Sequence, residues 1–243
     1  MVLLSVEDVT KHYRRGRREF LALRSVSIEV EDRELAVILG SRKSGRTTLL
    51  RVASGLERPD NGTVRFVGRA LSGPGAVLGR EIAYCHTAFP WVEGERVVDH
   101  VALPLLARRC TKREGRQAAE RALERVSAIE CAAMEPHELN AVERVRVSIA
   151  RGIAGRPRIV VVDDADSGMS SAQAGGVRAL LSSLARDDGV SVLMSASDPT
   201  FVAGADRVYT LEAGRVRGEA QAPTAEVLPL RPPRFGADAG HGR

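Results

Sequence analysis

Short apolar runs separated by polar or glycine-containing turns predict β-strands along much of the chain. Residues 2–9 and 25–30 alternate apolar with polar positions, the period of two that is typical of strands with one buried face. Residues 35–39 and 158–162 form continuous apolar runs, which are typical of parallel strands buried on both faces. These patterns predict both antiparallel and parallel strands.

The second half of the chain adds helical patterns and further strands. Residues 112–129 predict a helix with apolar side chains along one face, at Ala118, Ala122, Leu123 and Val126. Residues 190–195 predict a last parallel strand, followed by a helix through 201–205 and a closing hairpin around 212–214. The mixture indicates an α/β domain with an additional helical part.

The length and composition suit one such domain. The 243 residues are enough to bury a substantial core, but two full domains would be crowded. From Glu219 the chain becomes rich in proline, alanine and glycine, which predicts a disordered tail over 219–243. No apolar run is long enough to cross a bilayer and no secretory leader begins the sequence, so we expect a cytoplasmic protein. Three isolated cysteines, without metal-ligand spacing, are expected to be ordinary thiols.

The net charge of +5 permits attraction to nucleic acid or to an anionic membrane, without establishing either. The densest basic stretch, residues 14–18, is better interpreted as a solvated turn. Aromatic residues make up only 4% of the chain, which argues against stacking platforms for single-stranded nucleic acid. No specific nucleic-acid partner is therefore expected.

The most informative chemistry lies at Gly40-Ser41-Arg42-Lys43-Ser44-Gly45-Arg46-Thr47-Thr48, which has the frame of a nucleotide-binding P-loop. The loop follows the apolar run 35–39 and opens a helical run at 48–53. In such a setting, backbone amides and the positive end of the helix point at the phosphates, and the Thr47 hydroxyl reaches Mg²⁺. Arg46 stands where the motif requires lysine, so the charge is kept but the compact ammonium is lost.

The whole chain resembles the ATP-binding subunits of ABC transporters over about residues 3–218. Besides the P-loop, the matching segments are 4–10, 54–62, 101–106, 136–139, 146–157 and 205–216. The segments 14–23 and 101–106 look most like the macrolide- and lipoprotein-export branch. The resemblance implies an ABC-type P-loop NTPase fold over 1–218, with a mixed-sheet core, an N-terminal antiparallel β subdomain and a helical subdomain at about 88–150.

The resemblance also assigns roles to residues of the Walker motifs and switch loops. Asp163 would help to hold Mg²⁺ together with Thr47, and Asp164 stands in place of the catalytic glutamate. Thr87 occupies the position of the lid glutamine and Ser197 that of the switch histidine. Because a shift of about 1 Å in a catalytic base can lower the rate about 10²-fold, the shorter Asp164 would slow hydrolysis.

Substitutions also affect the P-loop and the signature loop. Lys43 occupies a family glycine position, where a side chain in the left-handed conformation costs about 1–2 kcal/mol. The signature loop that clamps the partner subunit's ATP is replaced by Asn140, Ala141 and Val142. Tyr13 remains at the position where the family stacks an aromatic ring on adenine, with a structural role for this tyrosine as the alternative.

Together these substitutions indicate a degenerate ABC subunit that binds ATP and Mg²⁺ weakly. We expect a homodimer or heterodimer on the inner face of the cell membrane. Its partner would be a membrane permease, an intact ABC ATPase or both, and its role structural or regulatory. A slow but active ATPase that powers export is the main alternative. A nucleic-acid-associated ABC protein fits less well, because tandem ABC units or coiled-coil insertions are missing.

Overall fold

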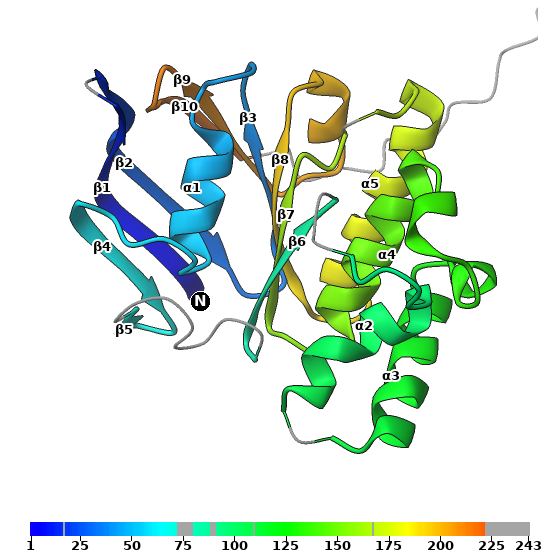
Figure 1. Ribbon diagram of the computed structural model, residues 1–243. Helices are drawn as coiled ribbons and strands as arrows, with labels where there is room; N and C mark the ends of the chain where they lie inside the picture. Colours follow the sequence, from blue (N-terminus) through cyan, green and yellow to red (C-terminus); the bar gives the residue numbers. More distant parts are fainter. Residues whose placement is uncertain (17, 72–79, 88–90, 109, 167, 222–243) are drawn as a thin grey trace, which may run out of the picture.

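The computed structural model describes residues 1–16, 18–71, 80–87, 91–108, 110–166 and 168–221, and places two β-sheets on either side of a short helix (Figure 1). The N-terminal sheet is antiparallel, with the strand order β2-β1-β4-β5. Its strands are β1 (Val2–Arg15), β2 (Arg18–Glu31), β4 (Asn61–Phe66) and β5 (Arg69–Ala70).

The second sheet is mixed, with the strand order β10-β9-β3-β8-β7-β6. Its parallel strands are β3 (Leu35–Leu39), β6 (Ile82–His86), β7 (Ile159–Asp163), β8 (Ser191–Ala196) and β9 (Arg207–Glu212). β10 (Arg215–Gln221) returns antiparallel to β9 and forms one edge. Because the parallel strands share one direction, the loops after β3, β7 and β8 gather at the same edge of the sheet.

The helices cover the two faces of the mixed sheet unequally (Figure 1). α1 (Arg46–Ala53) lies between the two sheets and contacts strands of both. The other face carries α2 (Val97–Leu106), α3 (Lys112–Arg125), α4 (Ala141–Ile153) and α5 (Ser171–Arg186). Short 3₁₀ helices occur at Ile129–Cys131, Pro136–Glu138 and Pro199–Val202. None of the helices within the described residues combines the length and apolar character that crossing a membrane requires.

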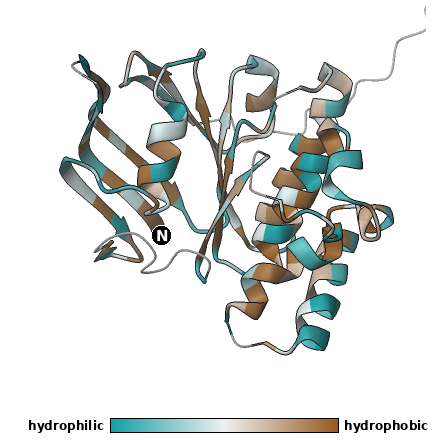
Figure 2. Ribbon diagram, in the orientation of Figure 1, coloured by the Kyte–Doolittle hydropathy of each residue, from teal (hydrophilic) through white to brown (hydrophobic). Residues whose placement is uncertain are grey.

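Alternate side chains of the mixed sheet supply two separate cores. In β7, Val160 and Val162 pack toward the outer helices, whereas Ile159 and Val161 pack toward α1 and the N-terminal sheet. Figure 2 shows the apolar residues concentrated in these strands and the polar residues on the outer surfaces of the helices. Because burying an aliphatic side chain contributes about 1.5–3 kcal/mol, both faces favour apolar residues, which explains the unbroken apolar run.

The predicted fold class is confirmed, and the run 35–39 coincides with β3. The first two strands are longer than predicted, because backbone pairing continues past their apolar parts to Arg15 and Arg18. Gly16, with φ of 62°, belongs to the turn between them. Solvent-exposed residues dominate this extension, so period-two alternation gave no signal for it.

Several element boundaries predicted for the second half of the chain differ from those in the structure. The helix predicted over 112–129 ends at Arg125, because Ser127 takes a positive φ of 54°. The helix predicted through 201–205 is wrong: a 3₁₀ turn spans Pro199–Val202, with the Asp198 carboxylate accepting from the Thr200 amide. Residues 219–221, expected in the tail, instead belong to β10, which pairs with β9 as far as Gln221. The rest of the predicted tail, residues 222–243, lies outside the described part.

Candidate nucleotide-binding site

The loop between β3 and α1 is held in place by close backbone contacts. Gly45 has φ of 108°, and a Cβ there would lie 2.6 Å from the Ala22 carbonyl oxygen. Gly214, in the β9–β10 turn, packs on the same carbonyl, and its amide donates to the Ser44 carbonyl oxygen at 2.8 Å. The β2 strand and the last hairpin therefore fix the loop, and glycine is required at both contact points.

The anchored loop forms one wall of a cavity of about 600 Å³. The residues that line it come from the P-loop, β2, the end of β7 and the last turn: Phe20, Leu21, Ala22, Arg24, Arg42, Lys43, Ser44, Gly45, Arg46, Thr47, Thr48, Asp164, Ala213 and Gly214. The described lining includes Arg24, Arg42, Lys43 and Arg46 as basic residues and Asp164 as its acidic one. The cavity therefore has the charge expected for binding an anion.

Lys43 has the backbone strain that its sequence position predicts. Its φ of 67° lies in the left-handed region that glycine occupies at little cost. The side chain is exposed and lines the cavity. Gly40 and Ser41 shape the start of the loop: the Gly40 amide donates to the Ala196 carbonyl, and the Ser44 amide to the Ser41 carbonyl at 3.2 Å.

Arg46 is buried, with a relative exposure of 7%, at the beginning of α1. Its Nη2 donates to Asp164 Oδ1 at 3.3 Å, forming an ion pair across the cavity. Its Nη1 and the Ser44 Oγ are buried without a hydrogen-bond partner among the described residues. Unpaired buried donors are costly, and phosphate oxygens would satisfy both, so a nucleotide's phosphates fit this cradle.

Asp163 lies at the end of β7, is 1% exposed and accepts hydrogen bonds from three hydroxyl groups. Its Oδ1 accepts from Thr47 Oγ1 at 3.3 Å and from Ser195 Oγ at 2.8 Å, and its Oδ2 accepts from the Tyr84 hydroxyl at 2.8 Å. Burial, and next the Asp163 charge, raise the pKa of Tyr84, so this hydroxyl stays protonated as a donor. The expected pair Thr47 and Asp163 does come together.

A Mg²⁺ ion would be held at the same oxygens of Asp163 and Thr47. A hard cation needs free oxygen lone pairs, directly or through its bound waters. Both oxygens of Asp163 already accept from protein hydroxyls, and the Thr47 hydroxyl donates to one of them. A carboxylate has about four acceptor sites and a donating hydroxyl keeps its lone pairs, so Asp163 Oδ2 and Thr47 Oγ1 still have lone pairs to offer, and the residues present fit the phosphates and the metal. Tyr84 and Ser195 were not predicted from the sequence, where their chemistry carries no motif.

Asp164 is in a strained and electrostatically unfavourable position. Its φ is 51°, and its amide donates to Ser195 Oγ at 2.9 Å. Burial raises the pKa of the Asp164 carboxyl above its usual range, and neighbouring Asp163 adds to this effect; the Arg46 guanidinium opposes them. The residue in the place of the catalytic glutamate is therefore tied to the P-loop cation.

Ser197, at the position of the switch histidine, is turned toward Asp166. The Asp166 Oδ2 accepts from the Ser197 amide at 2.6 Å, the Ser197 hydroxyl at 2.7 Å and the Asp198 amide at 2.9 Å. The loop after β8 is consequently fastened to the loop after β7. The sequence missed Asp166, because 31 positions separate it from Ser197 and no local pattern joins them.

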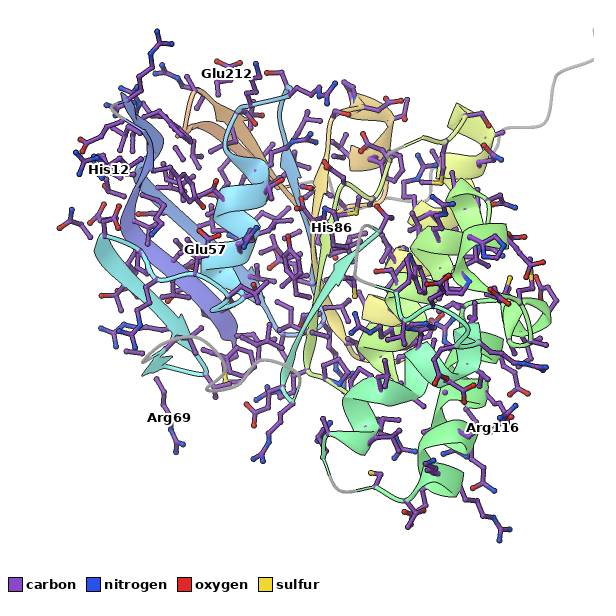
Figure 3. The ribbon with its side chains drawn as sticks, viewed as in Figure 1. His12, Glu57, Arg69, His86, Arg116 and Glu212 are labelled. Carbon is purple, nitrogen blue, oxygen red and sulfur yellow. The ribbon has the colours of Figure 1, made fainter. Side chains whose placement is uncertain are left out.

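The aromatic contribution to the cavity comes from Phe20 rather than directly from Tyr13. Tyr13 stacks on Phe20 with a centroid distance of 5.4 Å, and its hydroxyl bonds to Glu57, which Figure 3 shows between α1 and the N-terminal sheet. Phe20 is 52% exposed and lines the cavity, whereas Tyr13 is not among the described lining residues. The cross-strand pairing of Tyr13 with Phe20 explains this arrangement.

The remaining predicted site residues lie outside the described cavity lining. Thr87 follows β6 directly after His86, which Figure 3 shows at the end of that strand. Asn140 begins α4 with a capping box: its Oδ1 accepts from the Glu143 amide at 3.0 Å. Ala141 and Val142 form the first turn of α4, and Val142 packs against the core between the mixed sheet and the outer helices.

These features define a P-loop nucleotide-binding domain. The sequence profile of the ABC transporter family matches residues 23–167, and the chain belongs to this family. The lipoprotein-releasing system ATP-binding protein LolD of Chromohalobacter salexigens is 32% identical over 90% of this chain and 94% of its own length. The methionine import ATP-binding protein MetN of Rhizobium etli is 34% identical over 82% of this chain and 57% of its length.

A solved ATP-binding cassette shows the same fold. The dimeric structure of a cassette bound to ADP and phosphate, in a post-hydrolysis state, aligns with a TM-score of 0.82 at 24% identity, covering 90% of this chain and 98% of the cassette. The predicted membership of the ABC transporter ATP-binding subunits is thus confirmed. Domains of this family generally bind ATP and Mg²⁺.

Proposed function

We propose that this chain is an ABC ATP-binding subunit that binds nucleotide weakly, hydrolyses ATP at no more than a background rate, and serves as a structural or regulatory partner. The observation that carries the proposal is the Arg46–Asp164 ion pair inside the cavity. In this pair the guanidinium of Arg46, the cation of the P-loop, is bonded to the carboxylate of Asp164, which should activate water. Electrostatic stabilisation of phosphoryl transfer depends on groups that are already directed at the phosphates.

Two further contacts support loss of hydrolysis with retention of the fold. The hydroxyl of Ser197 is used by Asp166, so this side chain offers neither the cation nor the free donor of the switch position. Val142 packs against the core at the start of α4, where the signature loop would need a close backbone approach to a partner's phosphate.

The partner would be a membrane permease, an intact ABC ATPase subunit or both, on the inner face of the cell membrane. The name of the lipoprotein-releasing relative and the dimeric state of the solved cassette support this assignment. In a pair with an intact subunit, one composite site would contain this chain's altered Walker motifs. The other would contain its Asn140-Ala141-Val142 loop, so both sites would be impaired.

The alternative is a slow but active ATPase subunit that powers export. The close approach of Thr47 and Asp163, at 3.3 Å, favours it, since these residues keep the core of a phosphate and metal site. The likeness to proteins named for lipoprotein release and methionine import also agrees with an active transporter.

ATPase assays separate the two functions. Under the proposal, the purified chain shows background phosphate release, and Asp163→Ala does not change it. Turnover of about 1 s⁻¹ or more that disappears in Asp163→Ala would establish the active alternative. With an intact partner, the chain should leave or reduce the partner's turnover. Restoring Asn140→Ser, Ala141→Gly and Val142→Gly should raise it; severalfold stimulation by the unaltered chain would contradict the proposal.

A further inference from the structure

We propose that this chain distinguishes a nucleoside triphosphate from a diphosphate by itself, through Arg24, Arg42 and Lys43 at the outer end of the cavity. The inference deepens the proposed function, because it concerns the same cavity and rests on nucleotide binding there. The terminal phosphate would then be bound within one chain, without a contribution from a second subunit.

Arg42 and Lys43 are the two central residues of the outer turn of the P-loop. The Ser44 amide closes this turn by donating to the Ser41 carbonyl at 3.2 Å, and Lys43 has φ of 67°. A positive φ at the third residue of a turn ordinarily selects glycine or asparagine. Both side chains are exposed and line the cavity. The outer turn thus presents two positive charges to the cavity, one of them on a residue type that its backbone conformation disfavours.

The third cation, Arg24, approaches the same end of the cavity from β2. Its amide donates to the Gly214 carbonyl at 2.7 Å, and the Gly214 amide donates to the Ser44 carbonyl at 2.8 Å. Arg24 is therefore linked by two backbone hydrogen bonds to the residue that follows Lys43, and its exposed side chain lines the cavity. Among the residues that the structure describes, these three cations have no ion-pair partner.

Phe20 lies at the opposite end of the cavity from the three cations. It precedes Arg24 by four residues on β2, so at about 3.3 Å per residue the two positions are about 13 Å apart. Midway between them, the Ala22 carbonyl lies close to Gly45 of the P-loop. A nucleotide whose base stacks on Phe20 and whose phosphates cross the loop at Gly45 therefore has its terminal phosphate nearest the three cations.

The charge of Arg46, in contrast, is already matched by a carboxylate. Its Nη2 donates to Asp164 Oδ1 at 3.3 Å, while its Nη1 is buried and has no hydrogen-bond partner among the described residues. Arg46 thus offers a directed donor, and the positive charge in excess of Asp164 comes from the outer cations. A third phosphate adds negative charge to the ligand, and bonds from basic side chains to phosphate are stronger than neutral hydrogen bonds. The chain would therefore report which nucleotide is present without hydrolysing it.

Calorimetric titration of the full chain with ATP and with ADP, each in excess MgCl₂, tests the inference. We expect ATP to bind more tightly than ADP by about fivefold or more. A smaller ratio, or tighter binding of ADP, would overturn the inference while leaving the proposed function intact. Absence of binding for both nucleotides would overturn the nucleotide-binding part of the proposed function, and the inference with it.

A triple variant, Arg24→Gln, Arg42→Gln and Lys43→Gln, tests the cause. It should weaken ATP binding more than ADP binding and lower the ratio of the two affinities to about twofold or less. The charge-conserving exchange Arg24→Lys, Arg42→Lys and Lys43→Arg should keep the preference for ATP. If the triple glutamine variant binds neither nucleotide, Arg42→Gln alone should still lower the ratio. A folded glutamine variant that binds both nucleotides with the original ratio would refute the assignment.

A second triple variant controls for the loss of net charge. Arg69 lies on β5 and points away from the protein, at the end of the N-terminal sheet remote from the P-loop (Figure 3), and Arg113 and Arg121 are exposed on α3. Changing these three residues to glutamine removes the same charge outside the described cavity lining. The ratio of ATP to ADP affinity should stay as in the unaltered chain. An equal fall of the ratio in this control would show that overall charge, rather than Arg24, Arg42 and Lys43, sets the preference.

Discussion

Arg46 Nη2 lies 3.3 Å from Asp164 Oδ1, although 118 positions separate the two residues in the sequence. Arg46 begins α1 and Asp164 directly follows β7, so the ion pair joins the P-loop to the mixed sheet at the cavity, which both residues line. The resemblance to the ABC motif implies lysine at the position of Arg46 and glutamate at that of Asp164. The longer cation and the shorter anion bond to each other, and any phosphate that enters must compete with this pair.

The first prediction concerns that competition. Asp164→Asn should tighten ATP binding by about threefold to tenfold, because it releases the guanidinium and removes a carboxylate from the phosphate cavity. Titration calorimetry measures the change. Asp188→Asn, which breaks the Arg125–Asp188 pair at 2.7 Å outside the described cavity lining, is the matched control and should leave affinity unchanged. Unchanged or weaker binding in Asp164→Asn would show that the pair does not restrict the site.

The second prediction follows from the raised pKa of Asp164, whose causes are burial first and then the charge of Asp163. When a carboxyl has a higher pKa in the folded than in the unfolded state, its ionisation lowers the free energy of unfolding of the protein. That loss is absent below the unfolded pKa, near 3.8, and complete above the folded pKa. Asp164→Asn should therefore melt at a higher temperature than the unaltered chain at pH 7.

The pH dependence supplies the control for this effect. Melting curves of both proteins between pH 7 and pH 4 should converge as pH falls, because protonation makes Asp164 neutral in the unaltered chain too. Asparagine tolerates the positive φ at this position, so the substitution adds no backbone strain. A stability gain that persists at the acidic end, or a loss at neutral pH, would contradict the sign derived from the pKa.

The pattern of local residues predicted the scaffold better than the site. The run 35–39 identified β3 because both of its faces are covered by apolar groups, and the P-loop frame followed from glycines that local backbone contacts require. The contacts of Asp163 with Tyr84 and Ser195 join three strands that meet only in the folded sheet. Because such long-range hydrogen bonds leave no periodic pattern along the chain, they could not be predicted from local residues.

The third prediction assigns the aromatic platform to Phe20. This side chain is 52% exposed at the cavity, while the Tyr13 hydroxyl is held by Glu57. Phe20→Ala should weaken ATP binding by about 1–2 kcal/mol, or about fivefold to thirtyfold, through loss of stacking on the base. Inorganic triphosphate should bind both proteins equally, since it has no base. Tyr13→Phe keeps the ring that stacks on Phe20, so it should weaken ATP binding less than Phe20→Ala does. A larger loss of affinity in Tyr13→Phe would indicate that Tyr13 contacts the base directly.

The fourth prediction concerns strain in the P-loop. Lys43→Gly should raise the free energy of unfolding by about 1 kcal/mol, because φ of 67° is unfavourable for lysine, although the greater flexibility of glycine in the unfolded chain offsets part of the gain. Arg33→Gly is a suitable comparison, since exposed Arg33 has a similar φ of 62° outside the described cavity lining. Denaturant unfolding should give similar gains, but only Lys43→Gly should also weaken ATP binding, through the lost charge. Equal affinity in the two variants would exclude Lys43 from the phosphate cradle.

The last prediction separates the two parts of the proposed catalytic deficit, the Walker and switch residues and the signature loop. Arg46→Lys, Asp164→Glu and Ser197→His together should leave the chain without measurable ATP turnover, because a homodimer would still lack a signature loop to clamp the phosphate from the other subunit. Adding Asn140→Ser, Ala141→Gly and Val142→Gly should produce turnover above background. The signature substitutions also remove a half-buried valine and introduce glycine into a helix, so melting temperature must accompany each assay. If the first three substitutions alone activate the folded chain, the Asn140-Ala141-Val142 loop is a working clamp, and the loss of hydrolysis lies entirely in the Walker and switch residues.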